Sequence, residues 1–227
     1  MPPIVLWSLG NLLLLLTAYL FGSLPTGYLL GKLLKGIDIR EHGSGSTGAT
    51  NVLRTLGKGP GASVLVIDLL KGAAAIALVR FFYQTDSFVA LAPDNFNAIL
   101  WFPWVVVLGG LAVVLGHSKS IWLNFSGGKS VATGLGLLLA LNWQIGLMTF
   151  GVIGLVFAPS RIVSLSSISA AIAVPVLMVV LKQPIAYILL GLVGGGYVVL
   201  RHRSNIQRLL NGTEPSIGEK LERSATD

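Results

Sequence analysis

Cysteine is absent from this 227-residue chain, and charged side chains make up only 11% of it. Without a thiol the chain can form neither a disulfide nor a thioester intermediate, and it offers no thiolate ligands for zinc. The scarcity of charge, together with 53% hydrophobic residues and a mean hydropathy of +0.79, excludes an ordinary soluble domain. We therefore expect an all-α integral membrane protein in which residues 1–227 form a single polytopic domain.

Acidic residues are also few: the chain has 9 Asp and Glu and 16 Lys and Arg, which gives a net charge of +7. In a membrane protein, a basic balance indicates first of all cytoplasmic loops that set the topology. No basic tract is interleaved with aromatic residues, so nucleic-acid binding is not expected. The sequence also lacks a complete P-loop, an HExxH zinc motif and a nucleophile elbow, and its inner carboxylates are too few for a two-metal site.

The N-terminal apolar run covers residues 1–31 without a charged side chain, and the first cations, Lys32 and Lys35, follow it. A signal peptide carries its charge before the apolar core, so the run predicts a retained membrane span with an outer N-terminus. Residues 22–27 (GSLPTG) interrupt the run. Their proline and glycines predict a kinked or tilted helix.

Further apolar runs cover residues 62–82, about 96–116, 162–181 and 185–200. The run 131–158 has two interpretations. As one helix it would place Arg161 and the basic C-terminal segment outside, against the positive-inside rule. If it folds back near Asn142 as two short helices, both fall inside, although Lys182 is then outside. We favour the second interpretation, with about seven transmembrane helices, a cytoplasmic C-terminus and a polar, partly disordered tail over residues 213–227.

Two ionisable residues lie inside the run 62–82. Asp68 and Lys71 are one helical turn apart on the same face, where they can pair. Ionisable groups within a membrane helix are costly unless they are paired or functional. The two residues are therefore either a structural pair that supports the preceding loop or part of a functional site, and we favour the supporting pair.

Three polar segments fall on the inner side, and the first is residues 43–54, GSGSTGATNVLR. Its glycines and small hydroxyls let backbone N–H groups approach a ligand closely, and a cation follows, which suits a phosphate oxygen better than a carbonyl or a metal. A flexible linker would have a similar composition, and this segment alone does not separate the two. Its candidate residues are Ser44, Gly45, Gly48, Asn51 and Arg54.

The second and third segments, residues 116–133 and 201–214, repeat the combination of glycine, cation and His. Lys129 directly precedes an apolar helix, whose free N–H groups and dipole would help it to bind phosphate. A basic juxtamembrane helix touching anionic headgroups would also explain residues 201–214. Three similar segments on one side of the membrane favour a shared phosphate site instead. The candidates are His117, Gly127, Gly128, Lys129, His202, Asn205, Arg208 and Glu214.

Together the three segments resemble one family, the bacterial acyl-phosphate:glycerol-3-phosphate acyltransferases. Residues 43–54 are similar to the family's GSGNxGATNxxR-like pattern, residues 117–133 to GH followed by a KGGKGVAT-like run, and residues 202–214 to HxxNIxRLxxGxE. The resemblance spans nearly the whole chain, including the spacing of Asp68 and Lys71. Three positions depart from it: Ser46 stands where Asn is common, Ser126 where Lys is common and Ser130 where Gly is common.

The resemblance implies transfer of a fatty acyl group from acyl phosphate to the first hydroxyl of glycerol 3-phosphate, which yields lysophosphatidate and inorganic phosphate. It further implies a seven-helix fold in the inner (plasma) membrane of a bacterium, a site that faces the cytoplasm, and no metal, cofactor, acyl-CoA or acyl carrier protein. We expect membrane lipids around the protein, no nucleic-acid partner and a monomer.

Residue roles follow as a hypothesis from the resemblance. Both substrates are anionic, so the cations would keep them together in a low-dielectric site. The proton acceptor is left open between a histidine and a phosphate oxygen of the donor. The expected catalytic residues are His117, His202 and Asn205, the substrate-binding residues are Ser44, Asn51, Arg54, Lys129 and Arg208, the glycines for backbone approach are Gly45, Gly48, Gly127 and Gly128, and the supporting residues are Asp68, Lys71 and Glu214.

Two other functions would use some of the same residues. A transporter of an organic phosphate needs cations, but it should hold them near the bilayer midplane in broken helices related by internal repeats. Here the cations fall in inner loops and no convincing repeat is visible. A structural lipid-binding protein would explain the basic C-terminal segment but not two glycine-rich cationic loops.

Overall fold

The computed structural model describes residues 1–93 and 97–218, and within them every regular element is a helix. The elements are α1 (Pro3–Ser23), α2 (Thr26–Lys35), the 3₁₀ turn η1 (Ile39–Glu41), α3 (Ala49–Leu56), α4 (Lys58–Tyr83), α5 (Asp86–Val89), α6 (Ala98–Ser118), the 3₁₀ turn η2 (Ile121–Leu123), α7 (Val131–Leu141), α8 (Trp143–Ser160), α9 (Val163–Val180), α10 (Ile185–Arg201) and α11 (Arg203–Leu210).

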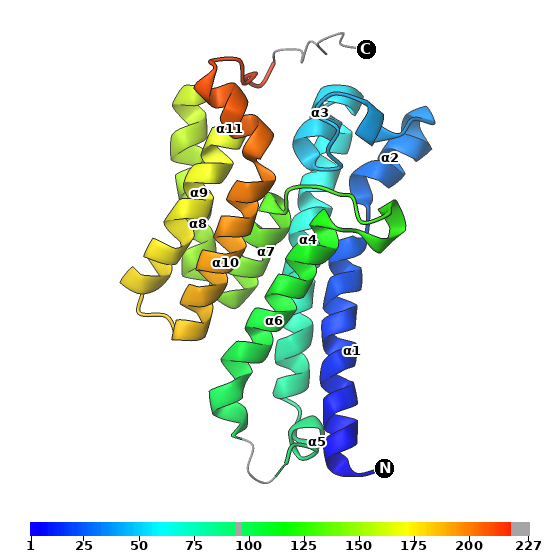
Figure 1. Cartoon of the computed structure of the whole chain (residues 1–227), viewed down its shortest axis with the longest axis vertical. Helices are drawn as coiled ribbons and strands as arrows, with labels where there is room; N and C mark the ends of the chain where they lie inside the picture. The colour runs from blue at the N-terminus through cyan, green and yellow to red at the C-terminus, as the bar shows by residue number, and fades with distance from the viewer. Residues whose placement is uncertain (94–96, 219–227) are drawn as a thin grey trace.

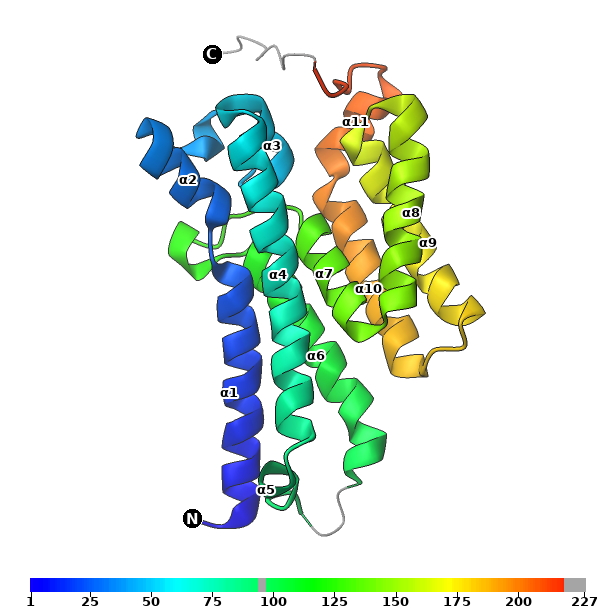
Figure 2. The same ribbon diagram turned by 180° about the vertical axis from the view of Figure 1, so that it is seen from behind.

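The long helices form two groups that lie side by side (Figures 1 and 2). In one group α1, α4 and α6 pack together, and in the other α8, α9 and α10 do so; α7 packs on both α4 and α8 and joins the groups. Close contact rests on small residues, because Gly72 and Gly136 lie against backbone carbonyls across the α4–α7 interface. Because glycine has no side chain, the two helix backbones can approach closely, and the resulting van der Waals packing drives helix association in lipid.

The first predicted interruption divides one apolar run into two helices. Helix α1 ends at Ser23 and α2 begins at Thr26, after Leu24 and Pro25. The helix is interrupted at Leu24 and Pro25, because Pro25 has no N–H to continue the helical ladder, and α1 and α2 together still form one candidate span, residues 3–35. The Leu24 carbonyl accepts a hydrogen bond from Lys71 Nζ at 3.0 Å, so the break is tied to α4.

The fold-back predicted near Asn142 is confirmed. Helix α7 ends at Leu141, and the Asn142 side chain caps α8 by accepting from the N–H groups of Gln144 and Ile145. With 11 residues, α7 is about 16 Å long, close to half of a bilayer. Arg80 of α4 donates to the Leu141 carbonyl at 2.7 Å and so satisfies the end of this short helix.

Five helical segments are long and apolar enough to cross a membrane: 3–35, 58–83, 100–118, 143–160 and 163–180. The pair α10 and α11, bent by 62° at His202, gives a sixth if it counts as one span, and α7 is shorter. The structure thus bears out an all-helical membrane protein with five or six candidate spans by length and composition, and the count of about seven stays a prediction. The predicted spans 62–82, 162–181 and 185–200 match α4, α9 and α10 within a few residues.

Part of the predicted polar tail packs against the helices. The N–H of Ile217 donates to the Arg161 carbonyl at 2.9 Å, and Glu214 and Pro215 accept hydrogen bonds from three helices. The chain therefore stays at the helix ends through these residues, and residues 219–227 lie outside the described part.

Candidate active site

A buried carboxylate, Glu214, accepts hydrogen bonds from several polar side chains at the α3 and α11 end of the molecule. Its Oε1 accepts from Asn205 Nδ2 at 2.6 Å and from Ser164 Oγ at 2.7 Å, and its Oε2 pairs with Arg208 Nε at 2.7 Å. Asn205 in turn accepts from Lys129 Nζ at 2.6 Å. The third motif is thus joined directly to the lysine of the second motif.

The first motif reaches the same cluster from the other helix group. Arg54, at the end of α3, donates to the Pro215 carbonyl at 3.1 Å, one residue after Glu214. Arg201, at the end of α10, donates to the carbonyls of Gly127 and Gly128 at 3.3 and 3.2 Å. All three predicted motifs therefore converge, although the contact of Arg54 with Pro215 joins residues 161 positions apart in the chain.

The cluster holds more positive than negative charge. Three cations, Arg54, Arg201 and Arg208, act on a fourth, Lys129, and the Glu214 carboxylate opposes them. The pKa of Lys129 is lowered to about 8, chiefly by burial. The three arginines also lower this pKa, and the Glu214 carboxylate opposes the shift. Such an excess of buried positive charge is stabilised by an anion, and guanidinium forks suit phosphate.

Glu214 itself stays ionised. Burial alone would raise the pKa of this carboxyl, but hydrogen bonds from Ser164, Asn205 and Arg208 outweigh burial and hold the pKa below its usual range. A carboxylate with three donors fixes the positions of those donors. The supporting role expected for Glu214 therefore has a geometric basis.

The glycines of the second motif lie against His117 at the end of α6. A Cβ on Gly127 would collide with the His117 carbonyl, and one on Gly128 would collide with His117 Nε2. The N–H of Gly128 also donates to the His117 carbonyl at 3.2 Å. The close backbone approach expected at these glycines is thus made to a histidine of the site, which leaves Lys129 directed toward Asn205.

The predicted ion pair within α4 is present and buried. Asp68 Oδ1 and Lys71 Nζ are 2.9 Å apart, with side chains 3% and 5% exposed. Asp68 also accepts from Thr26 Oγ1 at 3.3 Å and lies 3.7 Å from His117 Nδ1. Because Lys71 holds the Leu24 carbonyl as well, the pair joins the α1–α2 break to the histidine of the second motif.

Asn51 holds the first loop together. Its Oδ1 accepts from the Ser44 N–H at 2.8 Å, and its Nδ2 donates to the carbonyls of Ile39, His42 and Ser46 at 2.8–3.0 Å. The side chain is only 1% exposed. With both ends of the amide engaged on backbone groups, we infer that Asn51 positions the loop and that any direct contact with substrate comes from its neighbours.

The remaining predicted residues of the loop lie at its surface. Ser44 is exposed between Gly43 and Gly45, whose φ angles are +57° and +68°. These left-handed conformations favour glycine and form the tight turn that presents Ser44. Gly48, in an extended conformation, precedes α3. Ser44 is therefore accessible to a ligand, but no contact within the described residues joins it to the Glu214 cluster.

The two histidines differ in their surroundings. His202, 3% exposed, bonds through Nδ1 to the Val198 carbonyl at 2.7 Å. A carbonyl only accepts, so Nδ1 carries the proton and Nε2 of the neutral ring is an acceptor. His117 is buried, and its Nδ1 has Asp68 as its nearest acidic neighbour. His202 thus has the tautomer that a general base needs.

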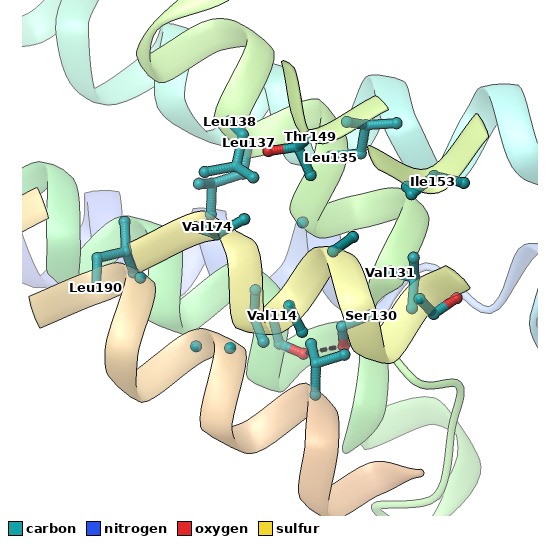
Figure 3. Close-up of a pocket in the computed structure, with 18 residues that line it drawn as sticks. Val114, Ser130, Val131, Leu135, Leu137, Leu138, Thr149, Ile153, Val174 and Leu190 are labelled. Atoms are coloured by element: carbon teal, nitrogen blue, oxygen red, sulfur yellow. Dashed lines mark hydrogen bonds between the residues drawn. The ribbon is translucent and has the colours of Figure 1, made fainter. Parts of the chain in front are cut away.

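An apolar cavity runs between α6, α7, α8, α9 and α10 (Figure 3). Ser130 and Val131, which follow Lys129, line one end, and Leu138 and Leu190 line the other. An apolar chain attached to a phosphate would find its head and its tail accommodated in continuous space.

Comparison with known proteins decides the family. A family model described as glycerol-3-phosphate acyltransferase matches residues 12–212. The chain belongs to the glycerol-3-phosphate acyltransferase family. Within it, the glycerol-3-phosphate acyltransferase of Trichormus variabilis is 67% identical over 204 residues, 90% of each chain. That of Acaryochloris marina is 62% identical over 215 residues, 95% of this chain and 96% of the relative.

Two solved structures of PlsY, an integral membrane glycerol 3-phosphate acyltransferase, share the fold. The glycerol 3-phosphate form has a TM-score of 0.79 and 38% identity, and it covers 92% of this chain and 96% of the PlsY chain. The lysophosphatidic acid form has a TM-score of 0.76 and 37% identity, and it covers the same shares of the two chains. The family resemblance seen in the three motifs is thereby confirmed, and an acyltransferase of phospholipid synthesis fits the membrane fold.

The three departures from the acyltransferase pattern have local explanations. Ser46 Oγ accepts from the Gly48 N–H at 3.3 Å within the first loop. Ser126 Oγ accepts from Arg40 Nη1 at 2.9 Å, which ties the second loop to η1. Ser130 adopts a left-handed φ of +62°, where glycine is favoured, and its hydroxyl donates to the Val114 carbonyl at 2.8 Å.

Sequence reasoning missed two participants of the acyltransferase site. Arg201 lies in the third segment, but its position at the end of α10 and not its spacing directs it to the glycine carbonyls. Ser164 belongs to the start of α9, where Ser164, Ser166 and Ser167 are all buried. Three serines at the start of an apolar run were the available signal in the sequence. In residues 1–93 and 97–218 no group of three or more His, Asp or Glu side chains could hold a metal ion.

Proposed function

We propose that this acyltransferase uses an acyl phosphate as its donor and transfers the acyl group to the sn-1 hydroxyl of glycerol 3-phosphate. One observation supports this most strongly: Lys129 belongs to the cationic cluster, and the next residue, Ser130, lines the apolar cavity. An acyl phosphate has the same succession of parts, a phosphate head and an apolar tail. Both substrates then present phosphates to one set of cations.

The reaction balances without a covalent enzyme intermediate. The sn-1 oxygen attacks the acyl carbonyl, the bond from the carbonyl carbon to the phosphate oxygen breaks, and the electron pair leaves with inorganic phosphate. The hydroxyl proton passes to His202 Nε2 or to a phosphate oxygen. Acyl phosphates are already activated, so alignment of the two substrates can supply several kcal/mol of the rate acceleration.

Charge is the main reason for the arrangement of side chains. Two phosphates repel each other in a buried site, and three positive charges in excess of Glu214 offset that repulsion. We assign Arg54, Lys129 and Arg208 to the phosphates, with Ser44 at the loop surface as a further donor. Asn205 positions Lys129, since its amide lies between that amine and Glu214.

The topology proposed with this function has an outer N-terminus, a cytoplasmic C-terminus and seven membrane segments, of which α7 is a half span. Supporting it, Lys32, Lys35 and the Glu214 cluster lie at the α2, α3 and α11 end, opposite the N-terminus in Figure 1, as the positive-inside rule requires. Trp101, near the start of α6, is an interface residue of the other side. We propose a monomer, a single domain over 1–227, in a bacterial plasma membrane.

The donor is tested with purified protein, sn-glycerol 3-phosphate and either palmitoyl phosphate, palmitoyl-CoA or palmitoyl acyl carrier protein. Inorganic phosphate and lysophosphatidate are measured together. The proposal expects equal amounts of both products with palmitoyl phosphate and no lysophosphatidate with either thioester. Lysophosphatidate formed from a thioester, with palmitoyl phosphate inert, would refute the choice of donor and leave the family assignment intact.

A further inference from the structure

The apolar cavity has a defined depth along two helices. On α7, Val131 and Leu138 line its two ends, and their seven-residue separation corresponds to about 10 Å along the helix. On α10, Val198 lies next to His202 and Leu190 lies eight residues earlier, a distance of about 12 Å. Figure 3 shows Leu138, Val174 and Leu190 toward one end and Ser130 and Val131 toward the other.

The end far from the cationic cluster is closed. Leu138, Val174 and Leu190 line the cavity there and are at most 7% exposed. Beyond them, Ile145 and Met178 are completely buried in the main core. An apolar chain that enters beside Lys129 therefore meets packed side chains after about 10–12 Å.

Two glycines leave the middle of the cavity open. Gly134 on α7 and Gly194 on α10 both line it, and a Cβ added to either one would meet no atom within 4 Å. The buried Thr149 hydroxyl also lines the cavity and has no hydrogen-bond partner in the described structure. Space that is lined by an unpartnered polar group and kept open by glycines is suited to a ligand rather than to tight helix packing.

We propose that this cavity measures the acyl chain: Gly134 and Gly194 admit it, and Leu138, Val174 and Leu190 stop it. This inference rests on the proposed acyl-phosphate donor. An extended chain advances about 1.3 Å per carbon, given C–C bonds of about 1.5 Å, so the cavity holds about eight to ten carbons. Longer chains leave through the open side and gain no further contacts with the closed end.

The test is a series of acyl phosphates from two to sixteen carbons, assayed for kcat/KM on wild type and on Gly194→Leu. The control is Gly196→Leu, on the same helix, where an added Cβ is equally unopposed but the residue does not line this cavity. Gly194 is four residues from Val198, about 6 Å, so its substitution should stop the chain after about five carbons. The ratio of variant to wild type at each length cancels the partition of the donor into detergent.

For Gly194→Leu, the ratio of kcat/KM between variant and wild type should be near one up to about four carbons. It should then fall by up to about fourfold for each further methylene and stop falling at about ten carbons. Gly134→Leu should give the same profile from the opposite helix, and Gly196→Leu should stay near one throughout. A flat profile for both cavity variants, with wild type active, overturns the inference. Wild type inert with every acyl phosphate would instead refute the proposed donor.

Discussion

The titration of Lys129 predicts how binding of glycerol 3-phosphate depends on pH. Burial lowers the pKa of this amine to about 8 in the unliganded site, with Glu214 opposing and three arginines adding to the shift. Only the charged amine attracts phosphate, so affinity is full below pH 8 and is lost as the pH rises above it. The phosphate, with a second pKa of about 6, stays dianionic over this range.

The size of the effect follows from the charged fraction. With a pKa of about 8, roughly ten in eleven Lys129 side chains are charged at pH 7 and roughly one in eleven at pH 9. If the complex requires the charged form, Kd rises about tenfold between these values, close to 1.4 kcal/mol. A charge-assisted hydrogen bond of about 1.5–3 kcal/mol is large enough to supply that difference.

The pH dependence of Kd is tested directly by calorimetric titration with glycerol 3-phosphate, in the absence of an acyl donor, from pH 6.5 to 9.5. Lys129→Arg is the control, because its guanidinium remains charged throughout and should give a Kd that does not change above pH 7. A wild-type Kd that is constant from pH 7 to 9, or an equal rise in Lys129→Arg, would refute the role given to this lysine.

Three substitutions test the supporting structure. Ser130→Gly relieves the strain of a left-handed φ, about 1–2 kcal/mol, but loses the hydrogen bond to the Val114 carbonyl. The free energy of unfolding, measured by thermal denaturation, should therefore change by less than about 1 kcal/mol, and a larger loss would contradict this balance. Asn51→Ala removes the side chain that holds the first loop, and kcat/KM for glycerol 3-phosphate should fall at least about tenfold, about 1.4 kcal/mol; unchanged kinetics would contradict the positioning role. Asp68→Asn leaves Lys71 buried without its charge partner and should lower stability by about 3–5 kcal/mol, most of which adding Lys71→Met should restore; no recovery would show that the pair is not the cause.

Hydrophobic runs and helix-ending residues predicted most of the fold. The boundaries of α4, α9 and α10, the fold-back at Asn142 and the pairing of Asp68 with Lys71 follow from local rules of hydropathy, capping and helical spacing. The predicted count of about seven includes α7, which is apolar but too short to cross a bilayer alone.

The site was predictable in its members but not in their contacts. The sequence places Asn51, Gly128 and Asn205 in polar segments between apolar runs, but tertiary placement decides what each one touches. Asn51 binds backbone groups of its own loop, and Gly128 makes room for the ring of His117. The role of residues 214–217 depends on where the chain returns after α11, which no local pattern specifies.

The central claim is that cations from three distant segments clamp the phosphates of both substrates. Phosphate release from palmitoyl phosphate, dependent on glycerol 3-phosphate, tests it most directly when wild type is compared with Arg54→Ala. Arg203→Ala, which removes an exposed cation of α11, is the matched control. The clamp predicts that Arg54→Ala keeps wild-type thermal stability and loses more than tenfold in kcat/KM, at least about 1.4 kcal/mol, while Arg203→Ala stays near wild type. Equal activity of all three proteins would contradict it.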